Sequence, residues 1–369
     1  MWLGIWSGLF AVPTLLGVLG VLWGAARVRD LRRPAFWGWL GLLAVLLTGR
    51  RWLRLLRPVR ADEPKPLTPT RRGAAAGRGG VRLEWEQFGP DDAPCLLLSH
   101  GWSLTHDTWY YQKKALSGEF RVVVWDMRGT GRSGHPSDED YSMEAVTDDL
   151  AAVFDTVDAG RHPDGCVLAG HSVGAMILIP FAARYPRQMA AVRGLALLAG
   201  TDEPILESMW GRGWLMPLRR PFWEPLGHIM GRFPRPFEWF AQFIERLGCV
   251  HLALMFGGRV GHLSRGDCDL VAGHCAEFSM RAAGRGALSC FAFDVRGLAP
   301  CLPVPTLFIT GEGDHNMPPT VQRAMAARLL GAKVVLLPSC GHLSLLECPE
   351  EVNAHLRRFA RRCLQMRCF

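Results

Sequence analysis

The chain has 369 residues, of which 49% are hydrophobic and 21% are charged. This balance suits a folded protein with a large core and excludes global disorder. The formal net charge of +8 does not indicate a nucleic-acid-binding protein, because arginines crowd the first sixty residues and no basic stripe interleaved with aromatic residues recurs later. The eleven cysteines form no C-x-x-C pair, and their odd number and scatter predict reduced thiols in a reducing compartment. We therefore predict no metal site.

The first sixty residues are expected to anchor the chain to a membrane. Residues 1–26 contain no charged side chain, and about twenty apolar residues suffice to cross a bilayer. The alternative is a cleaved signal peptide, but the basic stretch that usually opens one is missing. A second apolar run at 35–49 is short for a span and suits an interfacial or packed segment. Whether there are one or two spans stays open.

Arginines flank both apolar runs and predict the orientation of the anchor. With one span, the arginine-rich stretch that follows residue 26 stays on the cytoplasmic side. With a hairpin, the stronger basic flank at 50–60 stays there instead. Both arrangements place the rest of the chain in the cytoplasm. Residues 61–80 are rich in Pro, Gly, Ala and Arg, and we predict a flexible linker there.

Strand and helix patterns alternate over residues 81–201 and 299–369. Several of the strand patterns are continuous apolar runs, which is typical of parallel strands covered on both faces. We therefore predict an α/β core with a doubly wound, mostly parallel sheet, whose ligands bind at the carboxyl ends of the strands. The predicted strands lie at 81–88, 95–98, 122–125, 167–170, 195–198, 306–309 and 334–337.

The alternation breaks over residues 202–298, where aromatic residues, prolines and glycines accumulate. We predict that this stretch is an inserted, mostly helical cap over the carboxyl ends of the strands. Each aromatic residue taken singly is expected to pack within the insert. Together they imply an apolar roof over the site.

The stretch Gly170-His171-Ser172-Val173-Gly174 follows a short apolar run and precedes a helical pattern. A G-x-S-x-G turn between a strand and a helix is the context of a nucleophile elbow, with Ser172 as the nucleophile. Glycines on both sides let the backbone bend without a Cβ clash.

A serine hydroxyl needs a general base, and the base needs an orienting carboxylate. His342 follows the last predicted strand, and Asp314 follows the strand before it. Ser, Asp and His in this chain order are typical of one hydrolase fold. Asp202 ends an earlier strand and is the alternative acid.

The oxyanion formed during acyl transfer needs backbone N–H donors. His100-Gly101-Trp102 ends the 95–98 strand, so the Trp102 amide is expected to join the Val173 amide in an oxyanion hole. We interpret His100 as structural, holding this loop, and expect His171 to pack on the far side of the elbow.

Five stretches together resemble the α/β-hydrolase superfamily, in its capped esterase- and lipase-like branch. They are Leu98–Trp102, Asp126–Ser133, Gly170–Gly174, Gly311–Asp314 and Gly341–His342. The resemblance covers about residues 81–362 and implies that the D-x-R-G-x-G-x-S stretch is structural. Epoxide hydrolases and haloalkane dehalogenases of this fold place Asp where Ser172 stands, so the serine argues against both activities.

These observations predict a membrane-anchored serine hydrolase that cleaves a lipophilic carboxylic ester, such as an acylglycerol or another acyl lipid. Its catalytic residues would be Ser172, Asp314 and His342, with no cofactor. An acyltransferase or a perhydrolase would use the same triad, and a non-catalytic membrane scaffold is the alternative from another class. The sequence gives no indication of the oligomeric state.

Overall fold

The computed structural model describes residues 2–27, 34–256, 263–298 and 302–365. Its centre is one eight-stranded sheet in the order β1-β2-β4-β3-β5-β6-β7-β8. The pairs β1·β2 and β2·β4 are antiparallel, and every other pair is parallel. The strands are β1 (Arg71–Ala76), β2 (Arg82–Phe88), β3 (Cys95–Ser99), β4 (Arg121–Trp125), β5 (Cys166–His171), β6 (Val192–Leu198), β7 (Thr306–Gly311) and β8 (Lys333–Leu337). All seven predicted strands are present, as β2 to β8, and the predicted α/β fold is confirmed.

Strand β1 lies inside the stretch 61–80, which we predicted to be a flexible linker. It pairs along its whole length with β2, from Arg71 opposite Gln87 to Ala76 opposite Arg82. The sequence Arg-Arg-Gly-Ala-Ala-Ala lacks the alternation of large apolar and polar residues by which a strand is predicted. Its small side chains pair with β2 without that pattern. The linker prediction is therefore wrong for this strand, which the backbone ladder holds in place.

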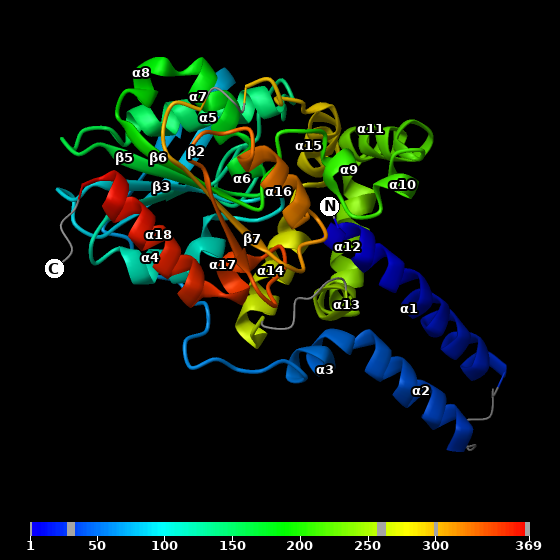
Figure 1. The fold of residues 1–369 in the computed structure, drawn as a ribbon. Helices are drawn as coiled ribbons and strands as arrows, with labels where there is room; N and C mark the ends of the chain where they lie inside the picture. The colour runs from blue at the N-terminus through cyan, green and yellow to red at the C-terminus, as the bar shows by residue number, and fades with distance from the viewer. Residues whose placement is uncertain (1, 28–33, 257–262, 299–301, 366–369) are drawn as a thin grey trace.

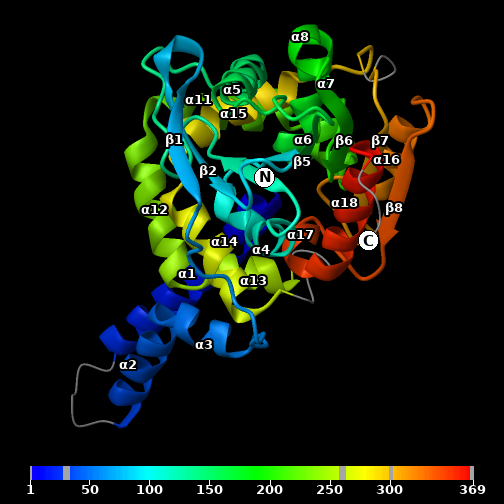
Figure 2. The same ribbon diagram turned by 90° about the vertical axis from the view of Figure 1, so that its left-hand side faces the viewer.

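Helices cover both faces of the sheet, so that the core has three layers (Figures 1 and 2). One face carries α5, α6, α7 and α8, and the other carries α4, α17 and α18. The core helices are α4 (Tyr110–Leu116), α5 (Met143–Thr156), α6 (Val173–Met176), α7 (Leu178–Arg184), α8 (Pro186–Met189), α16 (Pro319–Ala326), α17 (Ser344–Glu347) and α18 (Pro349–Cys363), with short 3-10 turns η1 (Arg78–Gly80) and η2 (His106–Trp109).

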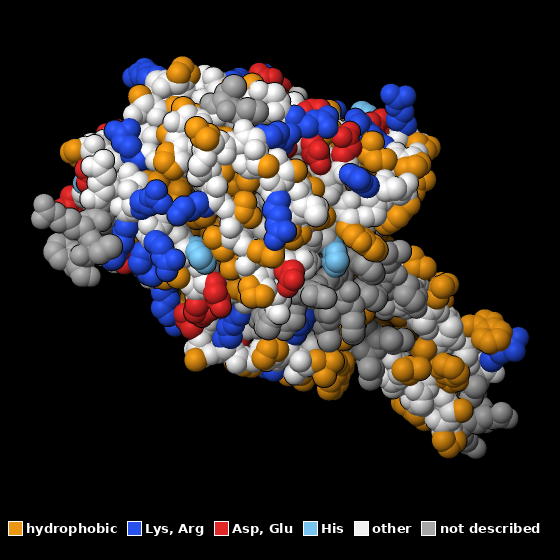
Figure 3. Space-filling view, viewed as in Figure 1, with side chains coloured by type: hydrophobic (Ala, Val, Ile, Leu, Met, Phe, Trp, Pro, Cys, Tyr) orange, Lys and Arg blue, Asp and Glu red, His pale blue; other side chains and the backbone are white. Residues whose placement is uncertain are grey.

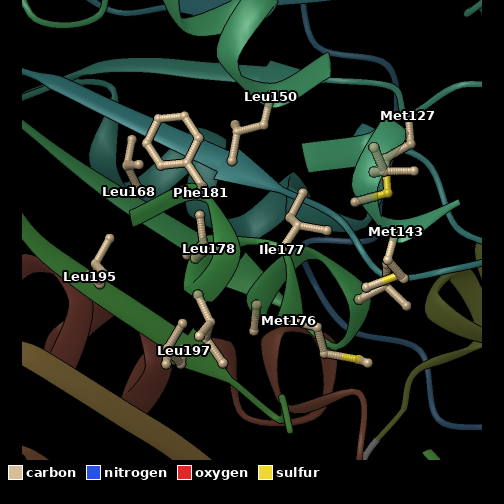
Figure 4. Close-up of a cluster of buried hydrophobic side chains, with 14 of the residues drawn as sticks. Met127, Met143, Leu150, Leu168, Met176, Ile177, Leu178, Phe181, Leu195 and Leu197 are labelled. Carbon is tan, nitrogen blue, oxygen red and sulfur yellow. The ribbon is translucent and has the colours of Figure 1, made fainter. Parts of the chain in front are cut away.

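The larger of the two main apolar clusters lies between the sheet and the helices α5 to α7. Figure 4 shows its members Leu150, Phe181 and Leu178 directed toward Leu168 and Leu195 on the strands. All five side chains are fully buried. Burial of this kind contributes about 25 cal/mol per Å² of apolar surface, and it fixes β5 and α6 on either side of the predicted elbow.

The insert between β6 and β7 is helical, as predicted. Its elements are α9 (Ile205–Ser208), α10 (Arg212–Leu215), the π-helix η3 (Arg219–Trp223), α11 (Glu224–Arg232), α12 (Pro234–Arg246), α13 (Cys249–Phe256), α14 (Arg265–Glu277) and α15 (Met280–Ala292). Helix α14 begins with a capping box in which Ser264 and Asp267 satisfy each other's backbone N–H groups. We refer to residues 202–298 as the cap.

The N-terminal segment forms α1 (Trp2–Arg27), α2 (Pro34–Leu47) and α3 (Gly49–Leu55). Helices α1 and α2 pack side by side as a hairpin that projects from the globular part, and α1 also packs against α13 (Figures 1 and 2). No helix within the described ranges is both long enough and apolar enough to cross a membrane. The predicted transmembrane helix in residues 1–26 is therefore not supported.

Candidate active site

Ser172 lies at the sharp turn between β5 and α6, with φ 54° and ψ −119°. The turn requires the flanking glycines: a Cβ on Gly170 would lie 2.1 Å from the Gly174 carbonyl oxygen, and one on Gly174 would lie 2.2 Å from that of Ser99. A serine held at positive φ is backbone strain of the kind found at functional sites. Ser172 is 8% exposed, so its hydroxyl is shielded but reachable.

Three side chains from three strand ends meet at this turn. The His342 Nε2 atom lies 3.2 Å from the Ser172 Oγ atom. On the other side of the ring, His342 Nδ1 lies 2.9 Å from Asp314 Oδ2. An ionised carboxylate only accepts, so Nδ1 carries the proton and Nε2 is free to take the one from the serine. A serine, a histidine and a carboxylate in this arrangement can activate the serine as a nucleophile.

Asp314 is fixed by the turn that follows β7. Its second oxygen accepts the backbone N–H groups of Asn316 and Met317, both at 2.8 Å. The side chain is fully buried. The alternative acid Asp202 has a different partner, because its Oδ2 atom lies 2.5 Å from Arg328 Nη2. The structure thus brings Asp314, and not Asp202, to the histidine.

The two residues predicted to supply oxyanion-hole amides lie beside Ser172. Trp102 and Val173 line the same cavity as Ser172. The loop that carries Trp102 passes very close, since a Cβ on Gly101 would lie 3.2 Å from Ser172 Cβ. This placement suits an oxyanion hole.

Two buried histidines hold the backbone around the site. His100 donates from Nδ1 to the Gly101 carbonyl at 2.7 Å and accepts the Met127 N–H at Nε2, 3.0 Å away, which ties the oxyanion loop to the end of β4. His171 donates from Nε2 to the carbonyl oxygen of His342 at 2.8 Å. Burial lowers the pKa of His171 to about 3, so it stays neutral while making this bond.

Glu347 is a residue of this site that our reading of the sequence missed. Its carboxylate accepts the N–H groups of Gly341, at 2.8 Å, and Leu343, at 2.9 Å, the two neighbours of His342. Burial raises the pKa of Glu347 to about 8, although both N–H groups favour the ionised form. The sequence shows a glutamate five residues after His342. It does not show that the side chain turns back to accept the N–H groups beside the histidine.

The stretch Asp126–Ser133 is placed as the resemblance implied, in a structural role. Asp126 accepts N–H groups from His106 and Arg132, and Arg128 forms two bonds of 2.6 and 2.7 Å with the buried carboxylate of Asp149. These contacts pin the loop after β4 without reaching Ser172. Because both charges of the Arg128–Asp149 pair are fully buried, loss of either partner would be costly.

A cavity of about 540 Å³ extends from Ser172 and His342 into the cap. This volume lies within the range of small-molecule sites. Most of its wall is apolar and comes from the cap helices. The apolar lining includes Ile205, Met209, Trp223, Leu226, Phe237, Phe240, Ile244, Val250, Leu254, Val271, Phe278, Ala287 and Phe291. Within the described part of the chain, no cluster of His, Cys, Asp and Glu has the arrangement of a metal site.

The chain is similar in sequence and in fold to known hydrolases. The sequence pattern of the alpha/beta hydrolase family matches residues 96–355. The pimeloyl-[acyl-carrier protein] methyl ester esterase of Nitrosospira multiformis is 26% identical over 285 residues, which is 77% of this chain and all of that protein. Human epoxide hydrolase 4 is 24% identical over 89% of this chain and 96% of its own. A thermophilic esterase from Thermogutta terrifontis has the same fold, with a TM-score of 0.62, 24% identity, and coverage of 80% of this chain and 99% of that one.

The chain therefore belongs to the alpha/beta hydrolase family, and the predicted family is confirmed. It is an enzyme of that family, a hydrolase whose relatives and structural neighbours include several esterases. The family match begins at residue 96, so the N-terminal hairpin, α3, β1 and β2 lie outside it.

Proposed function

We propose that this enzyme cleaves carboxylic esters through an acyl-enzyme on Ser172. The observation that carries the proposal is the hydrogen-bonded series from Ser172 through His342 to Asp314, which opens on an apolar cavity. A serine at an elbow, a histidine within reach and a buried carboxylate behind it supply nucleophile, base and orienting group.

The proposed reaction begins at Ser172. His342 Nε2 takes the Ser172 proton while Oγ attacks the acyl carbonyl, and the Trp102 and Val173 amides bind the oxygen that becomes negative. Asp314 stabilises the imidazolium and keeps its Nδ1 proton in place. His342 then gives its proton to the departing alcohol oxygen. A water activated by the same histidine releases the acid and restores the serine.

A lipophilic ester, such as an acylglycerol or another acyl lipid, fits the cavity best. The cap wall is almost entirely aliphatic and aromatic, so an acyl chain can be buried there, whereas a charged group would be desolvated without a partner. An ester is the substrate class named for the Nitrosospira relative, which supports ester cleavage but does not give the chain length.

Labelling with a fluorophosphonate probe tests the proposal directly. The full-length protein is expected to be labelled, and the variants Ser172→Ala and His342→Ala are expected to lose labelling while remaining folded. Absence of labelling in the folded wild type would contradict the serine mechanism. With p-nitrophenyl esters of graded acyl-chain length, kcat/KM is expected to be higher for longer chains than for the acetate ester. A strict preference for the acetate ester would contradict the lipophilic substrate.

Perhydrolysis is the second candidate, and one comparison favours it. The bifunctional esterase/perhydrolase DCH of Acinetobacter calcoaceticus is 37% identical over 120 residues, which is 32% of this chain. In that reaction hydrogen peroxide replaces water as the attacker of the acyl-enzyme and a peracid leaves. Formation of peracid from acetate and peroxide, lost in Ser172→Ala, would support this second activity.

We further propose that the α1–α2 hairpin lies on a lipid surface as an interfacial element. Large apolar side chains point outward from it, among them Leu16, Leu19 and Trp23, each 60–63% exposed, and hydrophobic atoms are visible along its described surface in Figure 3. Residues 1–47 contain four arginines and a single acidic residue, Asp30, so the hairpin also suits anionic lipids. Apolar faces with tryptophans and arginines are typical of proteins that bind in the membrane interface.

Co-sedimentation with vesicles tests this placement. The full-length protein is expected to bind vesicles of phosphatidylcholine and phosphatidylglycerol, and the double variant Leu16→Glu/Leu19→Glu is expected to bind them less. Leu330→Glu is the matched control, because Leu330 is fully exposed on the loop before β8. Equal binding by all three proteins, or no binding by the wild type, would contradict the proposal.

A further inference from the structure

The arginines that follow the hairpin are bound to the cap. Arg50 Nη1 lies 2.8 Å from Glu245 Oε1 on α12, and Arg54 Nη2 lies 2.6 Å from Asp269 Oδ2 on α14. Arg57 donates to the carbonyl oxygen of Leu254 on α13 at 2.7 Å. In both ribbon views α3 lies against α13 (Figures 1 and 2). We predicted that these arginines mark the cytoplasmic flank of a membrane span. The structure gives each of the three a partner within the protein instead. We call residues 49–63 the arm.

Arg60 is the last arginine of the arm, and it contacts both the cap and the end of α17. Its Nη1 atom lies 3.1 Å from Asp267 Oδ2 on cap helix α14. The same nitrogen donates to the carbonyl of Leu346 at 2.7 Å, and Nη2 donates to that of Glu347 at 3.0 Å. One guanidinium therefore joins a fully buried cap carboxylate to the carbonyl end of α17. The rigid fork of an arginine suits such a junction, because a single ammonium cannot reproduce its geometry.

From α17 the contact continues to the base. Glu347 is the last residue of that helix, and its carboxylate holds the N–H groups on both sides of His342. A displacement of the end of α17 would move this carboxylate, and with it the backbone of His342. The hydrogen bond of 2.9 Å from His342 to Asp314 depends on that backbone. Small errors in such geometry are costly in rate, up to about 100-fold for 1 Å.

We propose that Arg60 is a positioning residue for the catalytic base, which acts through α17 and Glu347 and couples the His342 loop to the cap. This inference rests on the proposed serine mechanism. It goes beyond that mechanism because Arg60 lies on the N-terminal arm, before residues 96–355 that match the family pattern. Asp267 and Tyr111, which also faces the guanidinium with its hydroxyl at 3.3 Å, complete the junction.

The test compares Arg60→Lys, Arg60→Met and the double variant Arg60→Met/Asp267→Asn in the full-length protein. Arg60→Lys keeps the charge opposite Asp267 but loses the fork. The double variant removes the donor without leaving a buried carboxylate unpaired. Arg51→Gln is the matched control, because Arg51 is exposed on α3 and its side chain has no ion pair with any residue in the described ranges.

With a short p-nitrophenyl ester, we expect kcat of the double variant to fall between about 10- and 100-fold while KM changes less than about threefold. Arg60→Lys is expected to lie between this variant and the wild type. The acid limb of the kcat–pH profile is expected to move to lower pH, because a displaced His342 loses part of its bond to Asp314 and its imidazolium is less stabilised. A purely structural role would leave that limb in place.

The proposal would be overturned if Arg60→Lys and the folded double variant both keep the kcat of the wild type and the acid limb of its pH profile. A loss in Arg60→Met that Asp267→Asn fully restores would also overturn it, because the defect would then come from the stranded carboxylate. Circular dichroism and thermal unfolding identify the folded variants. If the wild type itself is not labelled by the fluorophosphonate, the serine mechanism fails, and this result is distinct from a labelled wild type with active Arg60 variants.

Discussion

Asp202 and Arg328 form an ion pair, with 2.5 Å between Oδ2 and Nη2, so the alternative acid has a partner other than His342. Asp202 is almost fully buried, so its charge requires a partner, and that partner comes from the turn that follows α16. Asp314, and not Asp202, is therefore the carboxylate that lies beside His342.

This relationship gives the first prediction. Asp314→Asn is expected to lower kcat by about 10³- to 10⁴-fold, because an amide favours the wrong tautomer of the histidine. Asp202→Asn is expected to lower the melting temperature and to change kcat by less than about threefold. Ester hydrolysis by both purified variants measures this. A larger loss in Asp202→Asn than in Asp314→Asn would move the acid to the end of β6.

Gly286 on α15 gives the second prediction, because it accommodates the ring of Trp102. A Cβ at this position would lie 1.8 Å from Trp102 Cζ2, so the ring and its oxyanion loop would have to move. Gly286→Ala is expected to lower kcat at least tenfold. Gly273→Ala is the control on neighbouring helix α14, where nothing lies within 4 Å of the added Cβ. That change is expected to keep full activity and to stabilise by up to about 1 kcal/mol. Equal activity of the two variants would contradict the role of Gly286.

Glu347 gives the third prediction. Glu347→Gln is expected to lower kcat about tenfold, because one of the two N–H groups beside His342 loses its acceptor. The loss is expected in kcat, since the residue does not line the substrate cavity. Glu350→Gln, an exposed change in the first turn of α18, is the control and is expected to be neutral. Steady-state kinetics at saturating ester separate the two, and an effect confined to KM would speak against a positioning role.

His106 gives a prediction on pH. Burial opposes its charge, but the carboxylates of Asp126, Glu86 and Asp107 outweigh burial and Arg132, and they raise the pKa of His106 to about 9. The folded pKa lies above the unfolded value of about 6.5, so the stabilisation is complete below pH 6.5 and is lost as the pH rises through 9. The difference in unfolding free energy between wild type and His106→Gln is therefore expected to shrink by about 3 kcal/mol between pH 6 and pH 10. Urea unfolding at both pH values measures it. A difference that stays constant would mean that His106 does not change its charge in this range.

The sequence alone determined the parts of this protein whose physics is local. The apolar runs predicted β2 to β8, because strands buried on both faces carry hydrophobic residues without interruption. The strand, turn and helix around Ser172 identified the elbow, since only glycines tolerate such close backbone contacts. The order of Ser172, Asp314 and His342 predicted which strand ends would meet, because the carboxyl ends of parallel strands lie at one edge of the sheet.

Only the tertiary structure decided how charged side chains pair across long separations. Nothing near Asp202 in the chain shows that Arg328 neutralises it, and nothing near Arg60 shows that it binds α14 and α17. The local sequence around an arginine beside an apolar run is the same whether the side chain faces a membrane or a carboxylate of the cap. Its role is set by which charge folding brings within about 3 Å of it, and by the high cost of leaving that charge buried alone.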